Sequence, residues 1–264
     1  MILSRHYVAK PWGRTDLPHA LSGGDERIGE ILYDRDGAPL PVLVKWIFTS
    51  ECLSIQVHPC DEHARSRGLA GGKEEYWIVT HAEPGAVLGI GTKEEVPAEA
   101  LRTAALDGSI RDLIDWKPVQ PGDWYCIPPG TVHAIGAGVT LVEVQPNVDA
   151  SYRLYDHGRT RDLHVEEAIS VAVTSAYRGD HGRLNFSASS SRISTGAKFT
   201  IHACRGPLAY PAHAGPCLLV PVEGRLEVGG ASLDVGDVGY FDETMRITGT
   251  DGARYLLVEV ASQV

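Results

Sequence analysis

The sequence predicts a mainly β protein made of two barrels in tandem, with a few short helices. Short runs of β-branched and aromatic residues recur between turns along most of the chain. The 264 residues include 29 glycines and 16 prolines, which suits many strands and tight turns better than a helical bundle. A Gly-Asp turn that enters a strand occurs twice, at 120–125 and at 234–240. We interpret this weak internal sequence similarity as evidence that one barrel is repeated.

The predicted N-terminal strands show the clearest alternation of apolar and polar residues. The run 41–48 is β-branched and aromatic, and the run 53–58 alternates apolar and polar residues. Gln56 and His58 therefore share one face of their strand. A polar face of this kind normally points to solvent, but in a small barrel it can point into the lumen.

Helices and strands then alternate along the chain. Apolar spacing predicts a short helix at 61–67, a helical region at 97–116 that Gly108 splits in two, and a helix at 163–177. Further strands are expected at 75–80, 86–91, 124–127, 132–135, 139–144, 217–222, 225–228 and 255–260. The serine-rich segment 187–194 is typical of a linker. We therefore expect an N-terminal barrel at 1–158, a helix and linker at 159–194, and a smaller C-terminal β-domain at 195–264.

Composition narrows the class of protein. A formal net charge of −10 argues against broad binding to nucleic acid or to anionic membranes. Five cysteines without framework spacing fit a reducing compartment, and no stretch of the chain has the apolar length of a membrane span. We expect a soluble cytoplasmic protein, and nothing in the sequence indicates an obligate protein partner.

Four residues on separate strands have the side chains of a mononuclear metal site. They are Gln56, His58, Glu75 and His133, which offer an amide oxygen, two imidazoles and a carboxylate. Glu74 is an alternative to Glu75, since only the phase of the strand separates them. For Gln56 the alternative is a hydrogen bond to a ligand rather than coordination. The second Gly-Asp turn is not followed by a histidine motif, so the metal site is expected in the first barrel alone.

The histidine motifs resemble those of the cupin superfamily. Gly122 with Pro128-x-Gly130-x-x-His133 matches the second cupin motif up to its histidine, although Ala137 stands where asparagine is usual. The first motif appears as Gln56-x-His58, with Glu75 seventeen residues beyond. Such a resemblance implies barrels of the double-stranded β-helix (jelly-roll) type.

Within that superfamily the chain resembles class I mannose-6-phosphate isomerases, in a short bacterial form. The resemblance covers about the first 160 residues and includes Gln56-Val57-His58-Pro59, Pro128-Pro129-Gly130-Thr131-Val132-His133-Ala134 and Tyr152-Arg153-Leu154-Tyr155-Asp156. This sequence leaves no room for the helical domain of the longer family members, and little of it beyond residue 195 matches the family's sequence pattern.

The resemblance implies one zinc ion per chain, held by Gln56, His58, Glu75 and His133. It also implies a zinc-dependent aldose–ketose isomerase that interconverts mannose 6-phosphate and fructose 6-phosphate through an enediol. The residues it implies for catalysis are Arg153, Glu143 and Lys73, and Lys45 also lies on a lysine position of the family's pattern. Arginine does not titrate usefully, so Arg153 would stabilise charge, while Glu143 would move the proton.

The phosphate of this phosphorylated hexose substrate needs local cations. Arg159, Arg161, Lys73 and Arg153 are the candidates, and the sequence does not choose among them. Two alternative functions stay open at this point. One is a sugar-binding cupin without catalysis, and the other is a metal-dependent cupin oxygenase with iron on His58, Glu75 and His133.

Overall fold

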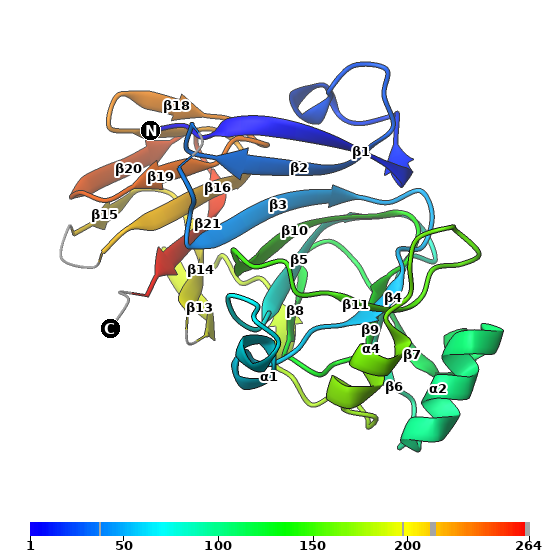
Figure 1. Cartoon of the computed structure of the whole chain (residues 1–264). Coiled ribbons are helices and arrows are strands. Elements are labelled where there is room, and N and C mark those ends of the chain that lie inside the picture. Colours follow the sequence, from blue (N-terminus) through cyan, green and yellow to red (C-terminus); the bar gives the residue numbers. More distant parts are fainter. Residues whose placement is uncertain (37, 197, 212–214, 262–264) are drawn as a thin grey trace.

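Sheets dominate the computed structural model, which describes residues 1–36, 38–196, 198–211 and 215–261. The mainly β fold with short helices predicted from the sequence is confirmed, and the strands form two barrels (Figure 1). Within the sheets, neighbouring strands run antiparallel. Among the described residues no helix combines the length and the apolar content that a membrane span requires.

The N-terminal barrel combines two sheets. One has seven strands in the order β1-β2-β3-β10-β5-β8-β12, and the other has five in the order β11-β4-β9-β6-β7. The strands are β1 (Ser4–Arg14), β2 (Ile28–Asp34), β3 (Val42–Phe48), β4 (Ile55–Val57), β5 (Glu75–Ala82), β6 (Val87–Thr92), β7 (Ile114–Pro118), β8 (Asp123–Ile127), β9 (His133–Ile135), β10 (Val139–Pro146), β11 (Tyr152–Tyr155) and β12 (His181–Arg183).

The C-terminal barrel has a five-stranded sheet in the order β13-β14-β21-β16-β19 and a four-stranded sheet in the order β15-β20-β17-β18. Its strands are β13 (Ser190–Thr195), β14 (Phe199–Arg205), β15 (Leu208–Tyr210), β16 (Cys217–Glu223), β17 (Leu226–Val228), β18 (Ala231–Leu233), β19 (Gly239–Phe241), β20 (Met245–Gly249) and β21 (Arg254–Val260). We keep the boundaries 1–158, 159–194 and 195–264 as a proposal, although β12 within 159–194 pairs with β8 of the first barrel. The predicted linker at 187–194 is wrong in part, because β13 begins at Ser190 and pairs with β14. Residues 197, 212–214 and 262–264 lie outside the described part.

Short helices cover the outer face of the five-stranded N-terminal sheet. They are α1 (Asp61–Ser66), α2 (Ala98–Asp107), α3 (Ile110–Leu113) and α4 (Val165–Val171), with a 3-10 turn η1 (His19–Leu21) elsewhere. Leu101 of α2 and Ala168 of α4 belong to one buried cluster with Val57 and Leu154 of the sheet. Gly108 ends α2 in the left-handed conformation with φ 85°, so the predicted split is confirmed.

The predicted helix at 163–177 is wrong in length. The observed α4 ends at Val171 because Ala172 adopts an extended backbone (φ −66°, ψ 128°). Val173 then makes a parallel bridge to Thr131, and its amide donates to the carbonyl of Gly130 at 2.8 Å. Pairing with the loop before β9 therefore replaces the last turns of the helix.

The seven-stranded sheet is buried on both faces. Val142 and Val144 of β10 pack outward in a cluster that also contains Leu256 and Val258 of β21. Leu141 faces the opposite way, into the N-terminal barrel. The C-terminal barrel thus covers the outer face of this sheet, and the inner face is left to line the lumen of the first barrel (Figure 1).

Candidate metal centre and the cavity around it

His58, Glu75 and His133 come together in the lumen of the N-terminal barrel. Glu75 begins β5, His133 begins β9, and His58 directly follows β4. The Nε2 atom of His58 lies 3.3 Å from Glu75 Oε2, and the Nε2 atom of His133 lies 3.3 Å from Glu75 Oε1. All three side chains are buried, and their potential ligand atoms lie within 4.8 Å of one another. Three of the four predicted ligand residues therefore form one compact group.

The hydrogen bonds of the two imidazoles orient their lone pairs. His58 Nδ1 lies 3.0 Å from the carbonyl oxygen of Ala150, and His133 Nδ1 lies 2.8 Å from that of Thr131. A carbonyl oxygen only accepts hydrogen bonds, so each Nδ1 carries the hydrogen and each Nε2 presents a lone pair toward Glu75. This is the tautomer that a metal ion needs.

Charge and burial also suit a cation at this point. Burial and the neighbouring His58 lower the pKa of His133 to about 3, so its imidazole is neutral near pH 7. Burial opposes ionisation of Glu75, but Lys73, His58 and His133 together outweigh it and keep the pKa of the carboxyl well below its usual range. Glu75 Oε1 is buried without a hydrogen-bond partner. A buried, unpartnered carboxylate oxygen facing the lone pair of His133 is costly unless a cation binds there, so this residue set fits a metal ion.

Gln56 lies beside this group as the cross-strand partner of His133. Its amide nitrogen, Nε2, is the atom that lies 3.3 Å from His133 Nε2. Coordination would use the amide oxygen instead, so the amide would have to turn over. The ligand role of Gln56 therefore stays a prediction.

Lys73 connects the group to an adjoining cavity. Its Nζ donates to Glu75 Oε2 at 2.5 Å and lies 3.1 Å from His58 Nε2, and the side chain is 6% exposed. The cavity has a volume of about 240 Å³. Its lining includes the cations Lys10, Lys45, Lys73, Arg153 and Arg161 and the carboxylates Glu30, Glu143 and Asp149. Cations outnumber carboxylates here although the whole chain carries a charge of −10, so the cavity suits an anion.

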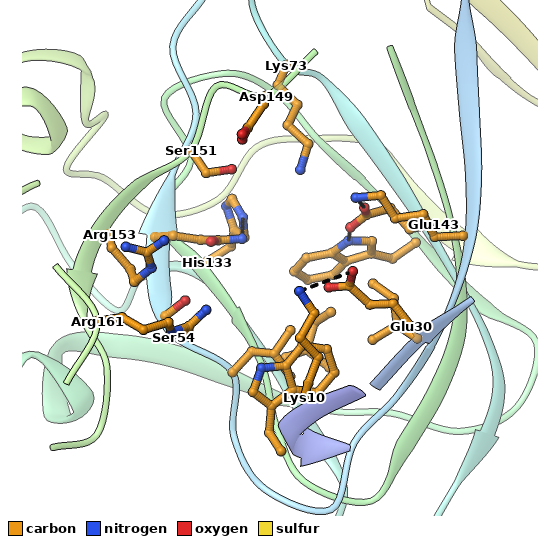
Figure 2. Close-up of a pocket in the computed structure, with 17 residues that line it drawn as sticks. Lys10, Glu30, Ser54, Lys73, His133, Glu143, Asp149, Ser151, Arg153 and Arg161 are labelled. Carbon is orange, nitrogen blue, oxygen red and sulfur yellow. Dashed lines mark hydrogen bonds and ion pairs between the residues drawn. The ribbon is translucent and has the colours of Figure 1, made fainter. Parts of the chain in front are cut away.

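The predicted catalytic residues lie on different walls of this cavity. Figure 2 shows Arg153 and Arg161 on one side, with Glu143 and Glu30 across from them. Glu143 is buried on β10 and accepts hydrogen bonds from Lys45 Nζ at 2.8 Å and from Trp77 Nε1 at 3.1 Å. The structure therefore brings Glu143, Lys73 and Arg153 to one cavity.

Among the predicted phosphate anchors, Arg161 has the most defined support. Its Nε and Nη2 donate to the two oxygens of Asp156, each at 2.7 Å, and Asp156 is buried. Arg153 donates through Nη1 to the carbonyl of Asp162 at 2.5 Å. Arg159 is not among the residues that line the cavity; it donates to the Asp156 carboxylate and, at 2.7 Å, to the carbonyl of Cys52. In the described structure Arg159 thus supports the cavity wall.

Several lining residues were missed by sequence reasoning. Lys10 and Trp12 of β1 and Glu30 of β2 reach the cavity, with Lys10 Nζ 3.5 Å from Glu30 Oε2. The two-residue spacing of Lys10 and Trp12 was an available signal, since it puts both on one strand face. Ser54, Asp149 and Ser151 also line the cavity, and Ser54 shares the polar face of Gln56.

The chain has curated relatives over about half of its length. It is 36% identical over 148 residues to mannose-6-phosphate isomerase of Streptococcus mutans, which covers 54% of this chain and 46% of the relative. It is 37% identical over 147 residues to mannose-6-phosphate isomerase ManA of Bacillus subtilis, covering 52% of this chain and 45% of the relative. The chain thus spans about half the length of the curated relatives it matches. No family model matches.

Solved structures match nearly the whole chain. The mannose 6-phosphate isomerase from Bacillus subtilis superposes with a TM-score of 0.80 at 22% identity, covering 98% of this chain and 99% of that one. A putative mannosephosphate isomerase from Archaeoglobus fulgidus gives 0.79 at 19% identity, covering 99% and 98%. At these identities the likeness shows the fold alone. Together with the sequence relatives, it confirms the resemblance predicted from the motifs.

Proposed function

We propose that this chain, a relative of the mannose-6-phosphate isomerases, is a zinc-dependent aldose–ketose isomerase. It would interconvert mannose 6-phosphate and fructose 6-phosphate through an enediol, with one zinc ion per chain. The observation that carries the proposal is the buried group of His58, Glu75 and His133 at the wall of a cavity rich in cations. The relatives named for this activity support it.

The residues of the group match the ligand preferences of zinc. Two imidazole nitrogens and a carboxylate oxygen, completed by the amide oxygen of Gln56, give a four-ligand set of the N and O type. When bound, zinc would supply a Lewis acid that polarises an oxygen of the sugar. The rest of the proposal concerns what the side chains of this chain do.

Isomerisation moves one proton between C2 and C1 of the open-chain sugar. In our proposal a Glu143 carboxylate oxygen removes the C2 proton of the aldose, giving an enediolate with its negative charge on O1. The proton of the O2 hydroxyl passes to O1, and Glu143 returns its proton to C1, giving the ketose. Arg153 keeps its charge throughout and would stabilise the negative oxygen that develops. Lys73 lies between the metal group and the cavity, where it would donate a hydrogen bond to a sugar oxygen.

Arg161, with Arg153 beside it, would bind the phosphate. Asp156 fixes the Arg161 guanidinium through Nε and Nη2, so its orientation is set before the substrate arrives. Among the described residues no hydrogen-bond acceptor is found for its Nη1, which leaves that donor for a phosphate oxygen. The cytoplasm, where phosphorylated hexoses are metabolised, is the location that goes with this proposal.

The test is a coupled assay for fructose 6-phosphate formed from mannose 6-phosphate, before and after chelation and after restoring zinc. We expect turnover that chelation abolishes and zinc restores. No turnover by metal-replete protein would contradict the isomerase. The His-Glu-His set also fits iron in an oxygenase, and oxygen uptake by iron-loaded protein would then point to that alternative. Sugar binding without turnover or oxygen uptake would favour a non-catalytic cupin.

A further inference from the structure

The start of β14 in the second barrel contacts the segment that carries Lys73 and Glu75. Phe199, the first residue of β14, packs edge-on against Tyr76, with ring centroids 5.5 Å apart and planes at 76°. Phe199 is 1% exposed, and Tyr76 directly follows Glu75 in β5. A side chain of the second barrel is therefore packed one residue away from the carboxylate of the metal group.

Lys198 makes a second contact with the same segment. Its Nζ donates to Asp61 Oδ1 at 2.7 Å and to the carbonyl oxygen of Gly72 at 3.2 Å. Asp61 Oδ1 in turn accepts the amide hydrogen of Gly72 at 2.7 Å. Both backbone polar groups of Gly72 are thus bonded, and the amide of Lys73 donates to the carbonyl of Pro59 at 3.1 Å.

The segment approaches its own barrel closely at Gly72. A Cβ on Gly72 would lie 2.4 Å from the carbonyl carbon of Cys60, so the chain before β5 approaches the start of α1 as closely as glycine allows. On the other side, a Cβ on Gly196 would lie 2.5 Å from Glu74 Oε1. The segment 72–76 therefore lies between the 59–61 stretch of its own barrel, which it approaches closely, and Gly196, Lys198 and Phe199 of the second barrel.

We propose that Lys198 and Phe199 are positioning residues, through which the second barrel fixes Lys73 and Glu75 at the metal group and cavity. Among the described residues, those that line the cavity all lie between Lys10 and Arg161. The second barrel therefore acts on the site through the backbone of the segment 72–76. The catalytic part of this inference rests on the proposed isomerase, because displacements of well under 1 Å at a reacting group lower the rate.

Lys198→Met tests the inference, because it keeps the length of the side chain and removes the charge. Lys198→Arg is the conservative rescue. Arg225→Met is the matched control, since it removes an exposed ion pair of the same barrel, with Asp234 at 2.7 Å. Both pairs are part exposed, so neither variant should change the unfolding midpoint much.

Hydrogen exchange of the amides in the segment 70–76 is the first measurement. We expect these amides to exchange about tenfold faster in Lys198→Met, at the wild-type rate in Arg225→Met, and near it in Lys198→Arg. In the isomerase assay, kcat/KM should fall about tenfold in Lys198→Met and recover in Lys198→Arg.

The two measurements separate this inference from the proposed function. Unchanged exchange in Lys198→Met would overturn the positioning role, whatever the assay gives. Faster exchange with undiminished kcat/KM would also overturn it, since Lys73 and Glu75 would not depend on the contact. Faster exchange in a protein whose zinc-loaded wild type does not turn over mannose 6-phosphate would support the positioning and reject the isomerase.

Discussion

Lys45 and Glu143 lie directly opposite each other on β3 and β10, and Lys45 Nζ is 2.8 Å from Glu143 Oε1. On its other side Glu143 is paired in register with Trp77 of β5, whose Nε1 donates to Oε2 at 3.1 Å. Lys45, Glu143 and Trp77 therefore lie side by side on three neighbouring strands, and the outer two side chains hydrogen-bond both oxygens of the Glu143 carboxylate. A carboxylate held in this way has a fixed direction relative to the cavity, which proton transfer to a bound sugar requires.

Glu143→Gln keeps the shape of the side chain and removes its charge. We expect kcat for mannose 6-phosphate to fall by about 10²–10⁴, the usual contribution of a general base. The free energy of unfolding should fall by about 3 kcal/mol, because Lys45 loses its counter-charge in a largely buried place. Steady-state kinetics and urea unfolding measure the two effects.

Lys45→Met is the comparison for that variant. It keeps Glu143 and its bond to Trp77, so it should lose comparable stability but much less kcat. Equal kcat for wild type and Glu143→Gln would remove Glu143 from the reaction and leave it as the partner of Lys45.

Zinc should stabilise the chelated protein. Ligands that bind the folded state stabilise it by about 4 kcal/mol when present at a thousand times their Kd. We expect the unfolding midpoint of the chelated wild type to rise on addition of zinc, and His133→Ala to show little of that rise. The measurement is thermal unfolding by circular dichroism at fixed protein concentration. An equal rise in both proteins would place the zinc elsewhere.

Much of the candidate site was predictable because strand alternation carries the information. The spacing of Gln56 and His58 put both on one face, and that face lies in the lumen. That inference depends on neighbours two residues apart, which sequence patterns report well. The choice between Glu74 and Glu75 stayed open in the sequence; in the structure Glu75 is buried and Glu74 is only partly buried.

What could not be predicted depends on contacts between distant segments. Val142 and Leu141 are both fully buried because the second barrel covers the outer face of β10, so hydrophobic pattern alone cannot assign their sides. The partners of Arg159 and Arg161 are set by the carboxylate of Asp156, and a run of arginines does not reveal which one faces a cavity. The position of the second barrel likewise could not be predicted, since little of its sequence matched a known pattern.

Arg161→Gln should weaken phosphate binding more than it slows chemistry. We expect KM for mannose 6-phosphate to rise about tenfold with kcat nearly unchanged, because a charge-assisted contact to the phosphate is lost. The rate of any slow isomerisation of mannose without a phosphate should be the same in this variant and in the wild type. Arg225→Gln, on the second barrel, is the control for loss of an exposed arginine. A fall in kcat at constant KM would instead put Arg161 at the reacting carbons.

Two of the five cysteines should react readily with a thiol reagent. Cys60 is exposed and Cys52 is partly exposed, whereas Cys126, Cys204 and Cys217 are buried and all five are free. Burial raises the pKa of Cys126 and of Cys217 to about 12, so at pH 8 about one in ten thousand of these thiols is ionised. Titration with Ellman's reagent should count two thiols in the native protein and five in denaturant. Fast modification of four or five native thiols would contradict this structure.

Asp156 should make the stability of the protein depend on pH in the acid range. Burial opposes its ionisation, but the hydrogen bonds and charges of Arg161 and Arg159 outweigh burial and keep the pKa of the carboxyl below its usual range. A carboxyl group whose pKa is lower in the folded than in the unfolded protein stabilises the fold at pH values above its unfolded pKa of about 3.9. This stabilisation is lost as the pH falls through the folded pKa. Asp156→Asn should therefore cost about 2 kcal/mol at pH 7, the worth of hydrogen bonds to a buried charge.

The difference between wild type and Asp156→Asn should shrink steadily as urea unfolding is repeated from pH 5 down toward pH 2, because the wild type then protonates the same carboxyl. Asp234→Asn is the control, since Asp234 pairs with Arg225 at the surface, where water screens the pair and the difference should be small at every pH. A stability difference for Asp156→Asn that stays constant across this range would show that its carboxylate charge contributes nothing. The cost would then come from altered packing alone, and Arg161 would not owe its orientation to an ion pair.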